Sequence, residues 1–213
     1  METKATRTYP IVDSIVFRKT KENFGGLSNM AAGFSIKVCD VIIPTAEHLY
    51  QACRFPDYPK LQWDIINEKS PMSAKWISRA NTKLTRSDWE LEKFKIMQWV
   101  IEVKLSQNWY NFSKLLLETG NKPIVEGSLK DKVWGAVKRE ENYVGINALG
   151  RILMHIREKF VLNDKPQNCV EPLKITNFVF LGYAIETICK DEYSEHNCTE
   201  KIGNNVNAMY YLF

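Results

Sequence analysis

The sequence predicts a predominantly helical fold with a small β element near the N-terminus and an extension at the C-terminus. Apolar residues recur at helical spacing, most regularly over Leu149–Phe160, where positions i, i+3, i+4, i+7 and i+11 are apolar. By contrast, Phe34–Val38 alternates apolar and polar residues and is followed by a Cys39-Asp40 turn and Val41–Ile43. That second pattern predicts a hairpin.

The first half of the chain contains a further strand candidate and two helix starts. Ile15–Phe17 is a short apolar run typical of a strand. Thr45 follows a proline and is placed to cap the backbone N–H groups of a helix that extends to about Phe55. Ser70-Pro71 combines a capping residue with a first-turn proline and predicts the start of another helix.

Two more helices are expected before the periodic segment that ends at Phe160. Ser87 and Glu90 have capping-box spacing, which predicts the start of a long helix through about Gln107. Another helix is predicted over Phe112–Glu118 and should end at Gly120.

In two segments the apolar residues follow neither helical nor strand spacing. Residues 121–147 read as loops, on which catalytic and binding residues often lie. Beyond residue 160 the composition changes: residues 163–168 read as a linker and Ile175–Leu181 as a strand candidate. We therefore expect a main domain over residues 10–160 and an extension over residues 161–213, whose role the sequence leaves open.

The net charge of +4 is unevenly distributed. Residues 161–213 hold four lysines and seven acidic residues, a balance of −3, which leaves +7 on residues 1–160. A mildly basic body suits an anionic ligand such as a nucleotide, a diphosphate or a nucleic-acid backbone, although many enzymes with neutral ligands are equally basic.

The cysteines and the apolar runs predict where the protein resides. The five cysteines form no C-x-x-C pair, and no apolar signal segment follows Met1, so we expect reduced thiols and a cytoplasmic protein. The longest apolar run, near Phe178–Ile185, is far shorter than the ~20 residues of a membrane helix, so no membrane association is expected.

Several reaction classes lose support because their motifs are absent. The sequence contains no P-loop, no G-x-G-x-x-G, no G-x-S-x-G and no cluster with metal-ligand spacing, so neither a metal nor a cofactor is expected. Acid/base chemistry by carboxylates, or binding alone, remains.

The segment after Pro44 is the strongest candidate for such chemistry. Glu47, Gln51 and Arg54 fall at i, i+4 and i+7 of the predicted helix, with His48 beside them. Glu47 lies in the first turn, where the helix dipole favours a carboxylate anion over a proton donor. A solvated polar face with a charge pair is the simpler alternative.

Two other regions could join this helix. Trp89 and Trp134 offer surfaces on which a nucleobase could stack, although for either side chain alone core packing is the commoner role. The turn from Phe24 to Asn29 contains two glycines that allow backbone to approach a ligand, although a plain turn is the commoner explanation. The loop from Glu126 to Asn147 adds further polar side chains.

Taken together, these segments resemble the NADAR family, also called YbiA-like. The family pattern has a Ser-Asn turn, then Pro-Thr-x-Glu-His, Ser-Pro-x-x-Ala, Asp/Asn-Trp, Trp-Gly and Asn-x-Leu-Gly, in that order. The matching segments here are Leu27–Met30, Pro44–Phe55, Ser70–Ala74, Asp88-Trp89, Asp131–Gly135 and Asn147–Arg157. The order holds over roughly residues 15–157, about two thirds of the chain.

The resemblance implies a compact, mostly helical α+β domain and an N-glycosidase that uses no metal. It implies cleavage of the C1′–N bond of a ribose that carries a phosphate. We expect removal of ADP-ribose from guanine bases, with ADP-ribosylated DNA or RNA as partner. Hydrolysis of phosphoribosylamino-pyrimidines of riboflavin synthesis, or binding of ADP-ribose-like nucleotides without cleavage, are the alternatives. The oligomeric state stays open.

The expected roles follow from charge development during such a cleavage. Positive charge grows at C1′, so Glu47 would stabilise it or orient water, and Asp131 would contact ribose hydroxyls or assist departure of the base. The residues expected to bind substrate are Phe24, Gly26, Ser28, Asn29, His48, Gln51, Arg54, Trp89, Trp134, Gly135 and Asn147.

This sequence departs from the family pattern at two points. Arg54 stands where relatives commonly have lysine, and arginine keeps the charge but does not readily form a Schiff base. In addition, Trp134-Gly135 is followed by Ala136–Asn142 rather than by a glycine-rich run, so the ligand contacts of that loop are expected to differ.

Overall fold

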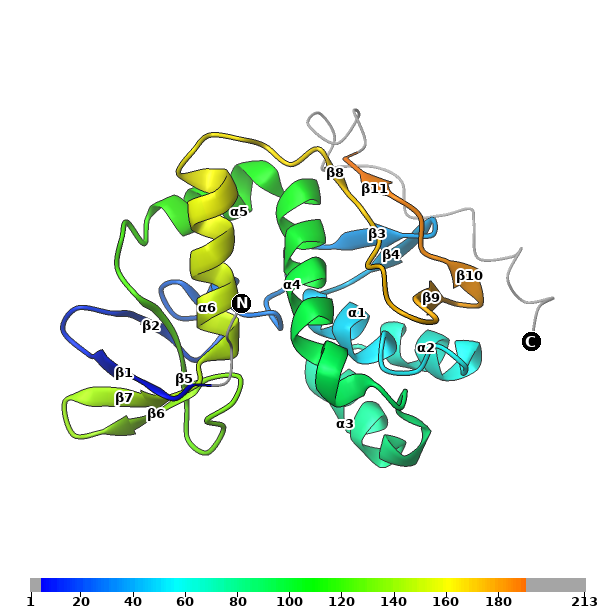
Figure 1. Ribbon diagram of the computed structural model, residues 1–213, viewed down its shortest axis with the longest axis horizontal. Helices are drawn as coiled ribbons and strands as arrows, with labels where there is room; N and C mark the ends of the chain where they lie inside the picture. Colours follow the sequence, from blue (N-terminus) through cyan, green and yellow to red (C-terminus); the bar gives the residue numbers. More distant parts are fainter. Residues whose placement is uncertain (1–4, 191–213) are drawn as a thin grey trace.

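The computed structural model describes residues 5–190 and shows helices packed around a central long helix, with a mixed sheet on one side (Figure 1). The helices are α1 (Ala46–Ala52), α2 (Pro59–Ile66), α3 (Pro71–Ala80), α4 (Trp89–Gln107), α5 (Trp109–Leu117) and α6 (Ala148–Ile156), which continues into one π-helical turn, Arg157–Val161. This is the α+β, predominantly helical fold that the sequence predicts.

The sheet holds five strands in the order β1-β7-β6-β5-β2. Its members are β1 (Arg7–Pro10), β2 (Ile15–Phe17), β5 (Ile124–Ser128), β6 (Ala136–Arg139) and β7 (Asn142–Gly145). Strand β5 is parallel to both neighbours, pairing Phe17 with Glu126 and Gly127 with Ala136, whereas the β6–β7 and β7–β1 pairs are antiparallel. Helix α6 packs against β5 (Figure 1).

The prediction that residues 121–147 lack regular structure is wrong, because three strands of this sheet lie there. Strands β6 and β7 are four residues each and expose much of one face, so their side chains alternate only weakly between apolar and polar. The pairing of β7 with β1, more than a hundred residues away in sequence, supplies a ladder that the local sequence does not reveal.

Most other predicted elements are confirmed. Strand β2 has the predicted bounds, and β3 (Ile36–Val38) with β4 (Val41–Ile43) forms the predicted hairpin. Helix α5 begins a few residues earlier than predicted and ends close to Gly120, whose φ of 55° lies in the left-handed region. The predicted cap at α3 is also present, because Ser70 Oγ accepts a hydrogen bond from the backbone N–H of Ser73 at 3.0 Å.

Two predicted caps are wrong. At α1, the Thr45 hydroxyl bonds His48 Nδ1 at 2.8 Å and caps no backbone N–H. At α4, the N-cap residue is Asp88 rather than Ser87, and its carboxylate pairs with the Arg86 guanidinium, with Nη2 2.9 Å from Oδ2. In both cases a side-chain partner competes for the polar group that would otherwise cap the helix.

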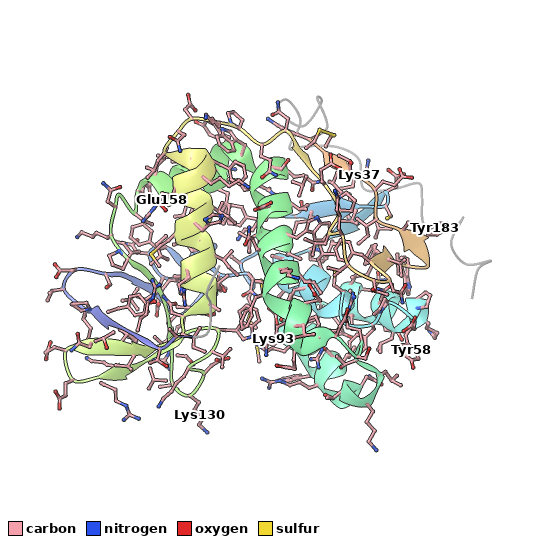
Figure 2. All side chains as sticks on the ribbon, in the orientation of Figure 1. Lys37, Tyr58, Lys93, Lys130, Glu158 and Tyr183 are labelled. Atoms are coloured by element: carbon pink, nitrogen blue, oxygen red, sulfur yellow. A yellow bond between two sulfur atoms is a disulfide. The ribbon has the colours of Figure 1, made fainter. Side chains whose placement is uncertain are left out.

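Helix α4 is buried from Ile96 onward and organises the core. It lies between α6 on one side and α1 on the other, and side chains fill the space around it (Figures 1 and 2). Ile96, Val100, Ile101 and Val103 are fully buried. From Ile96 to Ser106 nearly every residue is buried, as is typical of a helix at the centre of a domain.

The extension adds four short strands and packs against the helices. They are β8 (Cys169–Val170), β9 (Val179–Phe180), β10 (Tyr183–Ala184) and β11 (Ile188–Cys189). The predicted strand over Ile175–Leu181 is thus reduced to the two residues of β9. Phe180 is fully buried, the Trp99 indole N–H donates to the carbonyl of Glu171 at 3.1 Å, and Arg86 Nη2 donates to the carbonyl of Thr176 at 2.6 Å.

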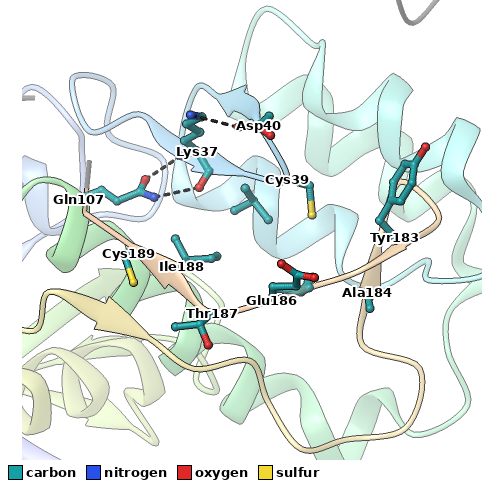
Figure 3. Close-up of a pocket in the computed structure, with 12 residues that line it drawn as sticks. Lys37, Cys39, Asp40, Gln107, Tyr183, Ala184, Glu186, Thr187, Ile188 and Cys189 are labelled. Atoms are coloured by element: carbon teal, nitrogen blue, oxygen red, sulfur yellow. Dashed lines mark hydrogen bonds and ion pairs between the residues drawn. The ribbon is translucent and has the colours of Figure 1, made fainter. Parts of the chain in front are cut away.

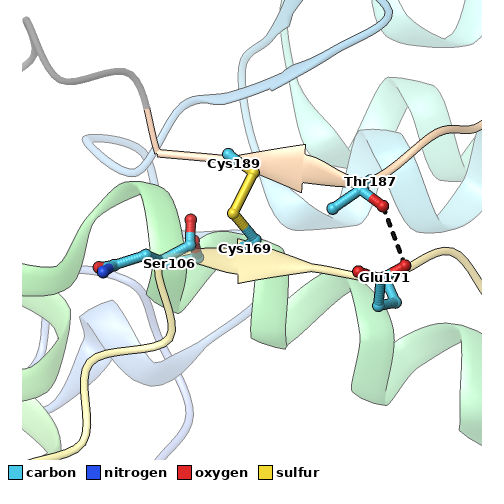
Figure 4. The surroundings of a disulfide bond; sticks show 6 residues. Ser106, Cys169, Glu171, Thr187 and Cys189 are labelled. Carbon is cyan, nitrogen blue, oxygen red and sulfur yellow. Dashed lines mark hydrogen bonds between the residues drawn. A yellow bond between two sulfur atoms is a disulfide. The ribbon is translucent and has the colours of Figure 1, made fainter.

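The expectation that the cysteines are all reduced is wrong for two of them. Cys169 and Cys189 form a disulfide that joins β8 to β11 (Figure 4). The antiparallel register places the two residues opposite each other, a proximity that their separation of 20 residues in sequence does not reveal. Cys39 and Cys53 are free thiols, and Cys198 lies outside the described residues.

Removal of this disulfide should destabilise the fold. Because a disulfide mainly restricts the unfolded chain, closing a loop of this length is worth roughly 3 kcal/mol in the free energy of unfolding. We expect a Cys169→Ser/Cys189→Ser variant to unfold at lower urea concentration than the wild type without reductant. With reductant the two midpoints should coincide; a difference that persists there would assign the effect to lost packing instead.

Within residues 5–190, no helix combines the length and the apolar composition that a membrane crossing requires.

Candidate active site

A cavity of about 860 Å³ opens where α1, α3 and the first turns of α4 face the end of β5 and the β5–β6 loop. Six basic and four acidic side chains line it, together with two tryptophans. The charged lining residues are Arg18, Arg54, Lys75, Arg79, Lys93, Lys130, Glu47, Glu90, Glu126 and Asp131. Such a mixture of carboxylates and excess cations suits an anionic ligand on which acid/base chemistry is performed.

Glu47 is the most constrained carboxylate of the cavity and is only 2% exposed. Its Oε1 accepts a hydrogen bond from Gln51 Nε2 at 2.9 Å, and its Oε2 accepts one from Asn29 Nδ2. Lys75 Nζ lies 3.7 Å from Oε1. Two amide donors and one ammonium group are partners suited to an anion, and together they fix the direction of the carboxylate.

Glu126 is the second carboxylate, and it has a different environment. It lies in β5, half-buried, and burial together with the negative charge of Glu47 raises its pKa to about 7, while Lys75 acts in the opposite direction. Near neutral pH its carboxyl group can therefore hold a proton beside the Glu47 carboxylate. Two carboxyl groups whose environments differ in this way are typical of acid/base pairs.

Asn147 holds Glu126 in place without reaching the cavity. Its buried side chain accepts from the backbone N–H of Glu126 at 3.0 Å and donates to the carbonyl of Ile124 at 2.8 Å. Gly135 also lies against this strand, since a Cβ at that position would come within 2.4 Å of the Glu126 carbonyl oxygen. Both residues thus fix the backbone of β5 that carries Glu126.

Asp131 lies at the exposed mouth of the cavity. Its Oδ1 accepts hydrogen bonds from the backbone N–H groups of Val133 and Trp134 at 2.8 and 2.9 Å. One carboxylate oxygen is therefore used to order the β5–β6 loop, a common role for aspartate in turns.

Arg54 is fixed by two hydroxyl groups and one aromatic ring. Nη1 donates to Ser78 Oγ at 3.1 Å and Nη2 to Thr85 Oγ1 at 3.0 Å, while Cζ lies 5.0 Å from the centre of the Trp89 ring. Burial, and to a lesser degree Arg79, lowers the pKa of Arg54. The negative charge of Glu90 acts in the opposite direction, but among the described residues no carboxylate forms an ion pair with this guanidinium, so it can attract an anion in the cavity.

Both predicted tryptophans line the cavity as part of one aromatic wall. Tyr50 joins them, with ring centres 5.1 Å from Trp89 and 5.4 Å from Trp134, and Phe94 packs 5.1 Å from Trp134. The wall is rigid because every ring contacts another ring.

Several predicted binding residues do not line the cavity. Phe24, Gly26 and Ser28 belong to a turn anchored by the buried Lys104, whose Nζ donates to the carbonyls of Gly26 at 2.8 Å and Ser28 at 3.1 Å. His48 points away from the cavity, and its Nε2 bonds the carbonyl of Glu68 at 3.1 Å. These residues place Asn29 and Glu47, so their contribution to ligand binding is indirect.

Five lining cations had no assigned role in the sequence pattern: Arg18, Lys75, Arg79, Lys93 and Lys130. Only Lys75 and Arg79 carry a local signal, because their i, i+4 spacing places both on one side of α3. The others reach the cavity from separate elements, which only the tertiary fold brings together.

A second cavity, of about 510 Å³, lies between the β3–β4 hairpin and Tyr183–Cys189 (Figure 3). The Lys37 ammonium group in its lining already forms an ion pair with the Asp40 carboxylate at 3.2 Å. Partial burial, followed by the charges of Asp40 and Glu186, raises the pKa of the Cys39 thiol and disfavours its reactive thiolate. The first cavity is therefore the candidate active site.

Comparison with known proteins decides the family. The family model described as "NADAR domain" matches residues 16–161. The chain belongs to the NADAR family. It is 34% identical over 164 residues to "N-glycosidase YbiA" of Escherichia coli, covering 76% of this chain and 99% of that protein.

Other relatives carry the NADAR region within longer proteins. The maize protein "Riboflavin biosynthesis protein PYRR, chloroplastic" is 36% identical over 162 residues, which span 69% of this chain but only 25% of the maize protein. "Riboflavin biosynthesis protein VVA0006" of Vibrio vulnificus is 34% identical over 74% of this chain and 41% of its own length.

The fold is also that of a solved NADAR protein. The NMR structure of Escherichia coli YbiA superposes with a TM-score of 0.62 at 33% identity, over 73% of this chain and 89% of that one. The names of these relatives support N-glycosidase chemistry in the NADAR family.

Proposed function

We propose that this protein is an N-glycosidase that hydrolyses the C1′–N bond of a ribose-phosphate N-glycoside, with ADP-ribose on a guanine base as its substrate. The observation that carries the proposal is the pairing of Glu47 with Glu126 in one cavity: a carboxylate held by three polar partners beside a carboxyl group with a pKa raised to about 7. Cleavage of a glycosidic bond needs one anion and one proton donor.

The two groups divide the reaction between them. As the C1′–N bond breaks, its electron pair goes to the base nitrogen, and the proton held by Glu126 neutralises that nitrogen. Glu47 stabilises the positive charge that develops at C1′. Water then adds to C1′, its oxygen forming the new bond and its proton returning to Glu126, so that the products are ADP-ribose and the unmodified guanine.

The rest of the cavity supports binding. Arg54, Lys75 and Arg79 would pair with phosphate oxygens, and Trp89 with Trp134 would stack against the base. Asp131 at the mouth would use its second oxygen for a ribose hydroxyl. Because Arg54 does not readily form a Schiff base, we propose direct attack by water with no covalent sugar intermediate at this position.

The direct test follows product masses. Purified protein incubated with an oligonucleotide carrying ADP-ribosylated guanine should release ADP-ribose and restore the unmodified oligonucleotide. Substrate that stays intact after long incubation with excess protein would contradict the proposal.

A second candidate function is hydrolysis of phosphoribosylamino-pyrimidines, favoured by the names of the maize and Vibrio relatives. Comparing kcat/KM for such a pyrimidine with that for ADP-ribosylated guanosine decides between the two substrates. The third candidate, binding without cleavage, would show ADP-ribose affinity but no turnover of either compound.

A further inference from the structure

The outer face of α3 carries an exposed aromatic side chain at the edge of the active-site cavity. Met72, Lys75 and Arg79 line the cavity, and Trp76 lies beside them on the same side of the helix, because these four positions span about 100° of the helical wheel. Trp76 is 60% exposed. All six tryptophans lie among the described residues, and the other five are buried or half-buried.

Trp76 does not belong to the hydrophobic core of the described residues. It makes no hydrogen bond or ring contact with them and does not pack against that core, unlike Trp63, Trp109 and Trp134. Single exposed apolar residues are common on proteins. A tryptophan beside a cationic cavity, with Met72 also 41% exposed next to it, is a more specific arrangement.

Next to Trp76, Lys75 faces Glu47, with Nζ 3.7 Å from Oε1, but Arg79 has no such partner among the described residues. The charge of Arg79 contributes to the lowered pKa of Arg54. In the β5–β6 loop, Lys130 of the cavity lining and the neighbouring Lys132 are exposed on either side of Asp131, and Leu129 beside them is 70% exposed. The cavity lining holds six basic against four acidic side chains, an excess of positive charge that favours a polyanion across the mouth.

We infer that a single strand of nucleic acid binds across this mouth, with a base stacked on Trp76 and its phosphates paired with Arg79 and the β5–β6 loop lysines. The inference rests on the proposed function, since it places nucleotides that flank the modified base. A single strand fits better than a duplex because stacking on a side chain needs a base whose face is free.

The test measures binding separately from cleavage. Fluorescence anisotropy of labelled poly(dT) measures binding to this surface alone, because the strand contains no guanine that could be modified. Trp76→Ala should weaken binding about 5- to 150-fold, the range that corresponds to loss of one stacked base. Trp76→Phe should retain most of the affinity. Tyr110→Ala, which removes an aromatic residue 78% exposed on α5, is the matched control and should bind like the wild type.

Cleavage gives an independent reading of the same surface. Trp76→Ala should lower kcat/KM for an ADP-ribosylated oligonucleotide by a similar factor and leave turnover of ADP-ribosylated guanosine unchanged. If no substrate is cleaved but poly(dT) binding depends on Trp76, the result contradicts the proposed N-glycosidase activity and still supports the proposed binding of single-stranded nucleic acid.

Three results would overturn the inference: no binding of poly(dT) by the wild type at low salt, equal binding by wild type and Trp76→Ala, or tighter binding of duplex. Displacement of poly(dT) by polyglutamate without dependence on Trp76 would assign the surface to an acidic protein. A parallel series with poly(U) distinguishes RNA from DNA as the preferred strand.

Discussion

Replacing Glu47 with glutamine is expected to lower kcat by about 10²- to 10³-fold, the usual cost of removing one group that stabilises transition-state charge. Glutamine keeps the size of the side chain but removes the anion that faces C1′. Because that charge develops only during bond cleavage, KM should change little. The measurement is steady-state hydrolysis of the ADP-ribosylated oligonucleotide.

Two controls separate catalysis from folding in this experiment. The Glu47→Gln protein should bind ADP-ribose and keep a cooperative unfolding transition, although Asn29 and Gln51 must adjust to a neutral partner. Glu118→Gln changes an exposed carboxylate at the end of α5 and should match the wild type. Turnover retained by Glu47→Gln would move the catalytic role to another carboxylate.

Substitution of Glu126 should remove the proton donor and change the pH profile. The wild-type rate should fall as pH rises through about 7, because the carboxyl group that donates the proton becomes ionised there. Glu126→Gln should lower kcat by about 10²- to 10⁴-fold and abolish this limb of the profile. A wild-type rate that instead increases through pH 7 would make Glu126 a base and exclude the assignment.

Stability provides the control for Glu126→Gln. A carboxyl group with a raised pKa in the folded state binds more protons there than in the unfolded chain between pH 4.5 and about 7, so its contribution to stability declines as pH rises across that window. The glutamine variant should therefore be at least as stable as the wild type at pH 8. Lower activity at that pH would then reflect chemistry rather than unfolding.

How far the sequence predicts the site depends on whether the relevant signal is local. The proline before α1 and its apolar stripe lie within one segment, so the helix and the joint position of Glu47 and Gln51 could be predicted. The role of Glu126 could not, because its raised pKa comes from burial in a sheet and from a carboxylate 79 positions away in sequence. The direct roles predicted for His48 and Asn147 needed side-chain directions that only the fold supplies.

The same distinction applies to the extension. The linker and the strand candidate are predicted from the local sequence alone. The disulfide and the contacts to Trp99 and Arg86 depend on strand register and tertiary packing, which the local sequence does not encode. The division of the chain at residue 160 stays a prediction, since the boundary is drawn from composition alone.

The packing of the extension has a consequence for protein engineering. Gln62 is fully buried in α2, and its amide accepts from the backbone N–H of Leu181 at 2.6 Å and donates to the carbonyl of Val179 at 3.3 Å. A chain shortened to the family match, residues 16–161, would leave that amide without these partners and uncover the apolar surface beneath Phe180. Gene fusions and minimal fragments of this protein should therefore keep the chain through Cys189, because the packed fold does not end where the sequence similarity ends.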